Sequence, residues 1–133
     1  MRNIIALFAS GLVVVALSVG VKSPASADQG ELSGTWTSID NDGSHQTLEI
    51  RGSGSGGTYA VMLFDESATA ACGGRPARLA GPGSVSGNDL LVTGALVCLA
   101  GGNPLTGRIT VAFTYSPGAD TLVDEFGVVW HRS

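Results

Sequence analysis

The charged residues that could bind or react with another molecule stand mainly where apolar, strand-like segments give way to turns. Carboxylates occur in adjacent pairs, as in Asp65-Glu66 and Asp124-Glu125, and basic residues are few. Side chains of this kind recognise a ligand or a partner through ion pairs and charge-assisted hydrogen bonds. The predicted binding residues are Asp40, Asp42, His45, Asp65, Glu66, Arg75, Arg78, Asp124 and Glu125.

Catalysis is not expected from these residues. A nucleophile needs a neighbouring base, and after residue 27 the chain offers only His45 and His131, with no Gly-x-Ser-x-Gly turn. Adjacent residues of a strand point to opposite faces, so neither carboxylate pair supplies an acid and a base to one substrate. An acid–base pair for glycoside cleavage would have to come from different strands. We therefore expect no enzymatic activity.

Metal and cofactor sites are not expected either. Two separated histidines and two cysteines that can bond to each other leave no zinc-binding set. The segment 40–43 resembles the start of a calcium loop, but its twelfth position is Arg51 instead of Glu, so a hairpin turn is predicted. The glycines of 52–57 have the spacing of a dinucleotide loop, yet a strand follows them where a helix would be needed.

The first 27 residues have the pattern of a secretory signal peptide. A basic residue is followed by a long apolar run and by Ala25-Ser26-Ala27, a small-x-small cleavage site. The apolar run is also long enough for a retained membrane anchor, which is the alternative. Cleavage would leave residues 28–133 as one secreted or periplasmic domain.

The domain after residue 27 is acidic. It keeps five of the seven basic residues and all eleven acidic ones, a net charge of −6 instead of −4. This balance disfavours nucleic acids and anionic membrane surfaces as partners, because both require clustered Lys and Arg. A small molecule or a basic extracellular protein is the expected partner.

The only cysteines, Cys72 and Cys98, each open a loop rich in glycine and proline. In an oxidising compartment they are expected to form a disulfide; two free buried thiols are the alternative. Closing a loop of this length would stabilise the fold by about 3.5 kcal/mol in the chain-entropy model.

The elements that must position these residues are strands. Runs rich in Val, Ile, Leu, Thr and aromatic residues alternate with clusters of Gly, Pro, Asn, Asp or Ser. This pattern predicts an all-β antiparallel meander of eight strands, closed as a small barrel, with a β-sandwich as the alternative. The fourth strand must bend or split at Gly81-Pro82-Gly83. The predicted strands are 34–39, 45–51, 58–65, 77–86, 89–99, 106–115, 120–124 and 128–132.

An up-and-down meander assigns every loop to one of two ends. Loops 40–44, 66–76, 100–105 and 125–127 share the end that holds both cysteines, and loops 52–57, 87–88 and 116–119 share the other. The predicted binding residues therefore meet at an acidic mouth that the disulfide braces, with Arg75 and Arg78 facing the carboxylates.

Apolar residues in alternate positions predict which strand faces are buried. The segments 58–64 and 90–99 are apolar on both faces, and loop 66–76 is expected to cover their outer side. The predicted core residues are Trp36, Leu48, Ile50, Ile109, Val111, Phe113 and Trp130.

The two ends of the domain resemble the calycin superfamily. Gly34-Thr35-Trp36 opens the first strand and Arg132 closes the last, as in lipocalins, where an arginine packs over that indole; avidins and small bacterial protease inhibitors share the barrel. The chain has no room for the lipocalin C-terminal helix and, apart from Trp36 and Trp130, lacks the tryptophans expected around biotin in avidins. The resemblance thus implies a barrel closed by Trp36 and Arg132, without the ligand chemistry of these families.

Two functions fit these features. The first is a secreted, non-enzymatic binding protein that holds a small, partly apolar molecule at the braced mouth. The second is a protein–protein module, such as an inhibitor of an extracellular protease or lysozyme, that uses the same loops.

Overall fold

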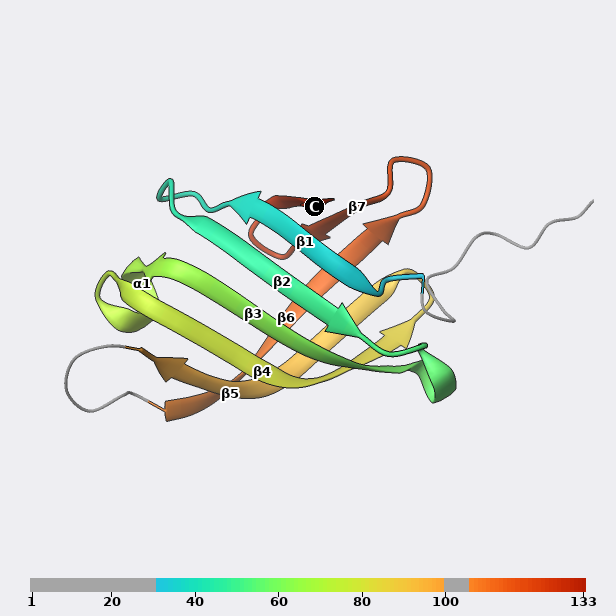
Figure 1. Ribbon diagram of the computed structural model, residues 1–133, viewed down its shortest axis with the longest axis horizontal. Coiled ribbons are helices and arrows are strands. Elements are labelled where there is room, and N and C mark those ends of the chain that lie inside the picture. Colours follow the sequence, from blue (N-terminus) through green and yellow to red (C-terminus); the bar gives the residue numbers. More distant parts are fainter. Residues whose placement is uncertain (1–30, 100–105) are drawn as a thin grey trace, which may run out of the picture.

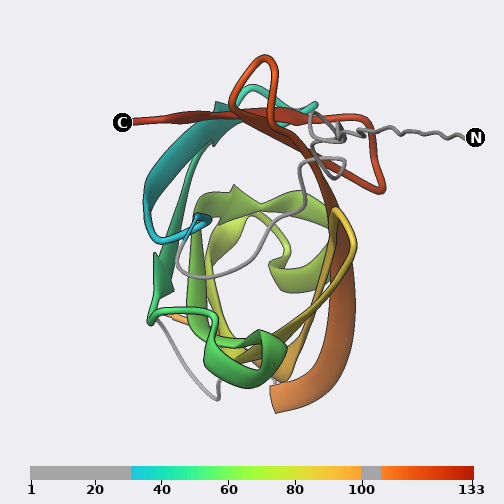
Figure 2. The ribbon, with the colours of Figure 1, turned by 90° about the vertical axis from the view of Figure 1, so that its right-hand side faces the viewer.

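The computed structural model describes residues 31–99 and 106–133. Each strand pairs antiparallel with the next, and the last returns to the first, so that eight strands form a closed barrel (Figures 1 and 2). The predicted barrel is confirmed, and the sandwich alternative is wrong. The predicted signal peptide lies outside the described residues. The strands are β1 (Gly34–Ile39), β2 (His45–Arg51), β3 (Thr58–Ala68), β4 (Arg75–Ser86), β5 (Asp89–Cys98), β6 (Thr106–Ser116), β7 (Thr121–Asp124) and β8 (Val129–Arg132).

Two short helices were not predicted. A 3₁₀ turn, η2 (Ser55–Gly57), lies between β2 and β3, and α1 (Thr69–Cys72) lies between β3 and β4. β3 is longer than predicted because it continues to Ala68 after a register shift beyond Asp65. That irregularity turns the chain toward the barrel interior, where α1 lies within the ring of strands when the molecule is seen along its length (Figure 2).

The barrel closes where the two chain ends meet. β1 and β8 pair at Trp36 with Arg132 and at Thr37 with His131. The guanidinium carbon of Arg132 lies 4.2 Å from the centroid of the Trp36 ring, so the expected cation–π stack is present. Arg132 also donates to the carbonyl oxygen of Ser33 at 2.8 Å. One side chain therefore fastens the first strand to the last.

Asp120 completes this closure. Its carboxylate accepts hydrogen bonds from Arg132 Nε at 2.8 Å and from Tyr115 Oη at 2.9 Å. The ring of Tyr115 packs edge-on against Trp36. The hydrogen bond from Arg132 lowers the pKa of Asp120 below its ordinary value. The closing strands are thus held by an aromatic pair and a hydrogen-bonded ion pair.

Replacing Arg132 with methionine is expected to raise the pKa of Asp120 and to lower the free energy of unfolding at pH 7 by about 1–2 kcal/mol, because a cation–π contact and a part-exposed ion pair are lost. The folded-state pKa of Asp120 is depressed, so the stabilisation by the pair is present above the unfolded pKa and is lost as pH falls through the folded pKa. Carboxyl NMR titration and urea unfolding measure the two effects.

Arg51→Met is the matched control, since Arg51 pairs with Glu49 on the exposed surface. It should cost less than about 0.5 kcal/mol and leave the pKa of Asp120 unchanged. Equal losses for the two variants would contradict the closing role of Arg132.

The half of the barrel around Trp36 is filled by large side chains. Trp36, Phe113 and Trp130 are buried, and Phe113 and Trp130 meet edge to face with centroids 5.8 Å apart. Of the predicted core, Val111 is only partly buried and Ile109 is 38% exposed, so the expectation of a buried Ile109 is wrong. The remaining core residues are Leu32, Leu48, Ile50, Tyr59, Val61, Leu79, Leu90, Val92, Tyr115, Leu122 and Val128.

β4 bends where the sequence predicted that it would bend or split. Its pairing with β5 is interrupted between Ala80–Ala95 and Gly83–Val92, although the strand itself is continuous. A Cβ atom on Gly94 would lie 2.2 Å from the carbonyl oxygen of Ala80. The two strands therefore approach so closely at this corner that only glycine fits there.

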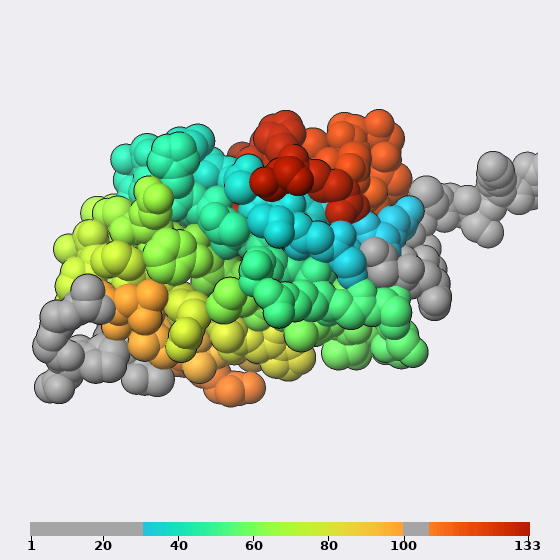
Figure 3. Space-filling model, viewed as in Figure 1, coloured from blue at the N-terminus to red at the C-terminus, as the bar shows by residue number. Residues whose placement is uncertain are grey.

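Segments 58–64 and 90–99, which are apolar on both faces, lie almost entirely in β3 and β5, and loop 66–76 does not cover their outer side. The colours of consecutive strands follow one another in order across the surface (Figure 3). Met62 of β3 and Leu91 of β5 are 36% and 46% exposed. Ala68 and Cys72 of the connecting segment instead pack into the interior with Ala77 and Cys98. The expectation that loop 66–76 shields the outer face is therefore wrong.

Candidate functional site

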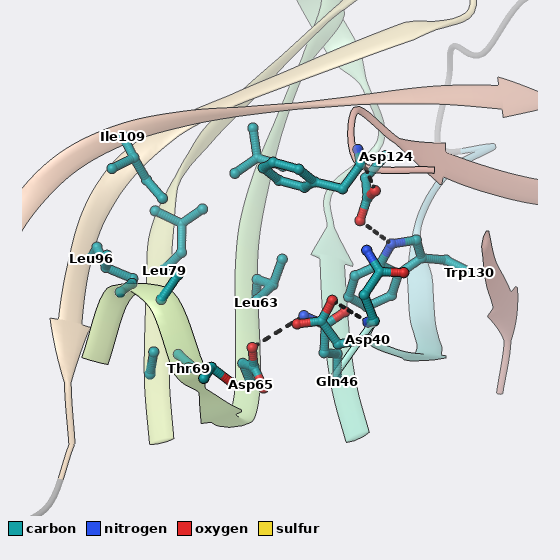
Figure 4. Close-up of a pocket in the computed structure, with 17 residues that line it drawn as sticks. Asp40, Gln46, Leu63, Asp65, Thr69, Leu79, Leu96, Ile109, Asp124 and Trp130 are labelled. Carbon is teal, nitrogen blue, oxygen red and sulfur yellow. Dashed lines mark hydrogen bonds between the residues drawn. The ribbon is translucent and has the colours of Figure 1, made fainter. Parts of the chain in front are cut away.

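A cavity of about 340 Å³ opens at the disulfide end of the barrel (Figure 4). Apolar side chains of β3 to β6 and β8 form its walls, and the turn after β1, the helix α1 and the turn after β7 form its rim. The lining residues are Asp40, Asn41, Gln46, Leu63, Asp65, Ala68, Thr69, Ala70, Ala71, Ala77, Leu79, Leu96, Ile109, Val111, Asp124, Phe126 and Trp130.

Small side chains explain why this end is hollow. Four alanines lie on the α1 side of the cavity, where the opposite half of the barrel has tryptophan and phenylalanine; they are Ala68, Ala70, Ala71 and Ala77. The floor is Trp130, whose ring rests on Phe113. An eight-stranded barrel is just wide enough for its side chains to fill it, so replacing large residues with alanine in one layer leaves room for a ligand.

The disulfide holds one side of the rim. Cys72 of α1 is bonded to Cys98 at the end of β5, with the two Cα atoms 5.6 Å apart, which confirms the predicted bond. The bridge spans β4 and packs against Ala68, Ala77 and Leu96. It therefore fixes α1 inside the barrel, where the helix borders the cavity.

Three buried polar side chains, Ser38, Gln46 and Asp65, form a hydrogen-bonded network at one side of the cavity. The hydroxyl of Ser38 donates to Gln46 Oε1 at 2.9 Å, and Gln46 Nε2 donates to Asp65 Oδ2 at 3.2 Å. The other oxygen of Asp65 accepts from the backbone N–H of Ser67 at 3.0 Å. Asp65 is 7% exposed, and these bonds replace the water that burial removes.

Asp42 joins the turn after β1 to α1. Its carboxylate accepts hydrogen bonds from the hydroxyl and the backbone N–H of Ser44 and from the hydroxyl of Thr69. The hydrogen bonds from the side chains of Ser44 and Thr69 lower the pKa of Asp42 to about 2. The Ser44 hydroxyl oxygen also lies 2.9 Å from Asp65 Oδ1, which connects this rim contact to the buried network.

Asp124 shapes the opposite rim. One of its oxygens accepts from the backbone N–H groups of Phe126 and Val128, at 2.9 and 3.0 Å, and the other accepts from Trp130 Nε1 at 3.2 Å. These bonds hold the turn after β7 and orient the indole on the cavity floor. Phe126, at the tip of this turn, lines the cavity and is 69% exposed.

Three of the predicted binding residues line the cavity: Asp40, Asp65 and Asp124. Asp40 belongs to loop 40–44, whereas Asp65 and Asp124 are the last residues of predicted strands. Thr69 of loop 66–76 and Phe126 of loop 125–127 also line the cavity, so the assignment of these three loops to one end holds. Loop 100–105 lies outside the described residues. Asp42 is at the rim but is bonded to Ser44 and Thr69.

The other predicted binding residues do not line the cavity. His45 and Glu66 are exposed beside it, and Glu125 accepts a hydrogen bond from the backbone N–H of Ala112. Arg75 Nε donates to the carbonyl oxygen of Cys72. Arg78 lies on the outer face because its neighbours point inward, so the expectation that it faces the carboxylates is wrong.

Several lining residues were not predicted as binding residues. Gln46 stands two positions before Leu48, and the alternation that placed Leu48 and Ile50 inside places Gln46 inside as well. Thr69 and Ala71 belong to a helix too short to show a period. Phe126 had no signal beyond being an aromatic residue in a turn.

Protein-family models, curated proteins and solved structures were compared with the chain, and none of them matches it. Within residues 31–99 and 106–133, no three His, Cys, Asp or Glu side chains are grouped so that they could hold a metal ion. In the same residues, no helix has the length and apolar character needed to cross a membrane. The function proposed below is therefore argued from the shape and the lining residues of the cavity.

Proposed function

We propose that this protein is an exported, non-enzymatic binding protein that holds a small, partly apolar molecule in the cavity at the disulfide end. The cavity carries the proposal, because its size and its mainly apolar walls with a few polar groups at the rim are typical of small-molecule sites. Export is supported by the Cys72–Cys98 disulfide, since such bonds persist in oxidising compartments.

The position of Ile109 supports a cavity that solvent can reach. Its side chain lines the inside of the barrel together with Val111, yet it is 38% exposed. Leu63, Leu79 and Leu96 lie beside Ile109 along one wall, and Trp130 lies across from them (Figure 4). An apolar ligand would remove this wall from water, and each buried methylene contributes about 0.8 kcal/mol.

A second candidate is the protein–protein module. The observation in its favour is Phe126, since an exposed aromatic side chain at a rim can serve as an anchor for a partner protein. The two functions are separated by denaturing the protein purified from its culture medium. Mass spectrometry of the extract identifies a stoichiometric small molecule if the first is correct, and co-purification of one protein that Phe126→Ser abolishes favours the second.

A large side chain placed in the cavity should weaken the binding of an apolar ligand. Ala71 lines the cavity from α1 and is exposed, so Ala71→Phe should fold normally and lower the affinity for a neutral apolar dye such as Nile red at least about tenfold, which equals about 1.4 kcal/mol. Quenching of the tryptophan fluorescence and the fluorescence of the dye report occupancy.

Ala95→Phe is the control, because Ala95 is exposed on the outer side of β5. It should leave the affinity unchanged. Tight binding by the Ala71→Phe variant, or an equal loss in both variants, would contradict a site inside the barrel.

A further inference from the structure

We infer that the ligand is an amphipathic cation, with an apolar body in the cavity and an organic ammonium group at the rim beside Asp40. This inference rests on the proposed function, because it names the class of molecule that the same cavity accepts. It follows from the charges that line the cavity, from the hydrogen bonds that already occupy them and from the aromatic groups beside them.

The charges that line the cavity have one sign. Three carboxylates contribute to the lining, from Asp40, Asp65 and Asp124, and no Lys, Arg or His side chain of the described residues does. The arginines lie elsewhere: Arg51 pairs with Glu49, Arg132 pairs with Asp120 and Arg78 lies on the outer face. A ligand with a carboxylate or phosphate head would therefore face like charges without a compensating cation.

Only one of these carboxylates is available to a ligand. Asp65 is bonded to Ser44, Gln46 and Ser67, and Asp124 is bonded through both of its oxygens to the turn and to the indole of Trp130. Asp40 accepts one hydrogen bond, from the backbone N–H of Asn41 at 2.7 Å, through Oδ1. Within the described residues its Oδ2 has no partner, and Asp40 stands at the rim where a ligand head would lie.

Aromatic side chains support a cation at this place. Phe126 and Trp130 both line the cavity, one at the rim and one on the floor. Of these two, Phe126 stands at the same opening as the Asp40 carboxylate, and a ring face and a carboxylate at one opening both attract an organic ammonium ion. The walls of Leu63, Leu79, Leu96 and Ile109 would contact the apolar remainder of the ligand.

The experiment compares three probes that share one tail: octylammonium, octanol and octanoate. Calorimetry measures the affinity of the full mature protein for each probe at neutral pH and low salt. We expect octylammonium to bind about fivefold more tightly than octanol, and octanoate to bind more weakly than octanol, since a part-exposed ion pair contributes about 1 kcal/mol. Added salt should reduce the preference for octylammonium.

The variant Asp40→Asn tests whether the Asp40 carboxylate causes the preference for a cationic head group. It should reduce the octylammonium-to-octanol preference to about twofold or less and leave the affinity for octanol unchanged. Glu66→Gln removes an equal charge from the same end of the barrel, outside the cavity lining, and should leave the preference intact.

The possible results separate the inference from the proposed function. If octanol binds as tightly as octylammonium, if octanoate binds best, or if Asp40→Asn and Glu66→Gln act equally, the inference is wrong and the proposed function stands. If no octyl probe or Nile red binds while the protein is folded, the proposed function fails, and the inference fails with it.

Discussion

Replacing Gly94 with alanine is expected to lower the free energy of unfolding by about 3 kcal/mol or more. The added Cβ atom would lie 2.2 Å from the carbonyl oxygen of Ala80 and 2.9 Å from the backbone nitrogen of Gly81. Both obstacles are backbone atoms, so no rotation of a side chain relieves the overlap. β4 and β5 would have to separate at the corner where their pairing is already interrupted.

Gly107→Ala is the matched control. Gly107 also lies in a strand, β6, and nothing lies within 4 Å of the position that its Cβ atom would take. Urea unfolding followed by circular dichroism should show a change within about 0.5 kcal/mol for this variant. If Gly94→Ala were as stable as Gly107→Ala, the close approach of β4 and β5 would be incorrect.

Removing the disulfide is expected to have the second large effect. The double variant Cys72→Ala/Cys98→Ala should lose about 3.5 kcal/mol in the chain-entropy model, because the unfolded chain regains the freedom that a bond between residues 26 positions apart removes. α1 would then keep the hydrogen bond between Thr69 and Asp42 and the one from Arg75 to the carbonyl oxygen of Cys72, but not its covalent link to β5. We therefore expect weaker binding of Nile red as well as lower stability, measured by urea unfolding and by dye titration.

Wild-type protein treated with a reductant provides the control for this variant. Reduction breaks the same bond but keeps both sulfur atoms as thiols. The reduced wild-type protein should therefore lose as much stability as the double variant, within about 1 kcal/mol. A double variant as stable as the oxidised protein would show that the bond contributes little to the fold. Unchanged dye affinity in a folded double variant would show that α1 is positioned without the bond.

The fold was largely predictable because its strands are local patterns. The predicted bounds of β1 and β2 match the structure, since alternating residues such as Leu48 and Ile50 are bounded there by turns rich in Asp, Asn, Ser and Gly. The extension of β3 to Ala68 was missed because it depends on a register shift, which only the pairing with β4 reveals. α1 was missed because four residues carry no periodic signal.

The candidate site was predictable in location and less so in detail. Strand parity placed Asp40, Asp65 and Asp124 at one end, and the cavity is there. Alternation identifies the face on which a side chain lies but not its depth along the barrel, so Ile109 was assigned to the core although it lies in the open layer. Arg78 could have been placed outside, since Ala77 and Leu79 on either side of it are buried.

The dense packing around Trp36 has a consequence for exchange. Within the described residues, the side chains of Trp36, Phe113 and Trp130 fill the section of the barrel beneath the cavity. The cavity is therefore closed at that end and does not run through the barrel. The small molecule proposed above would therefore enter and leave by the same opening. A change in the width of that opening would alter the association and dissociation rates of the proposed ligand by the same factor and leave its affinity unchanged. The residence time of the proposed ligand would therefore depend on the opening as well as on the contacts it makes once bound, whereas its affinity would depend on those contacts alone.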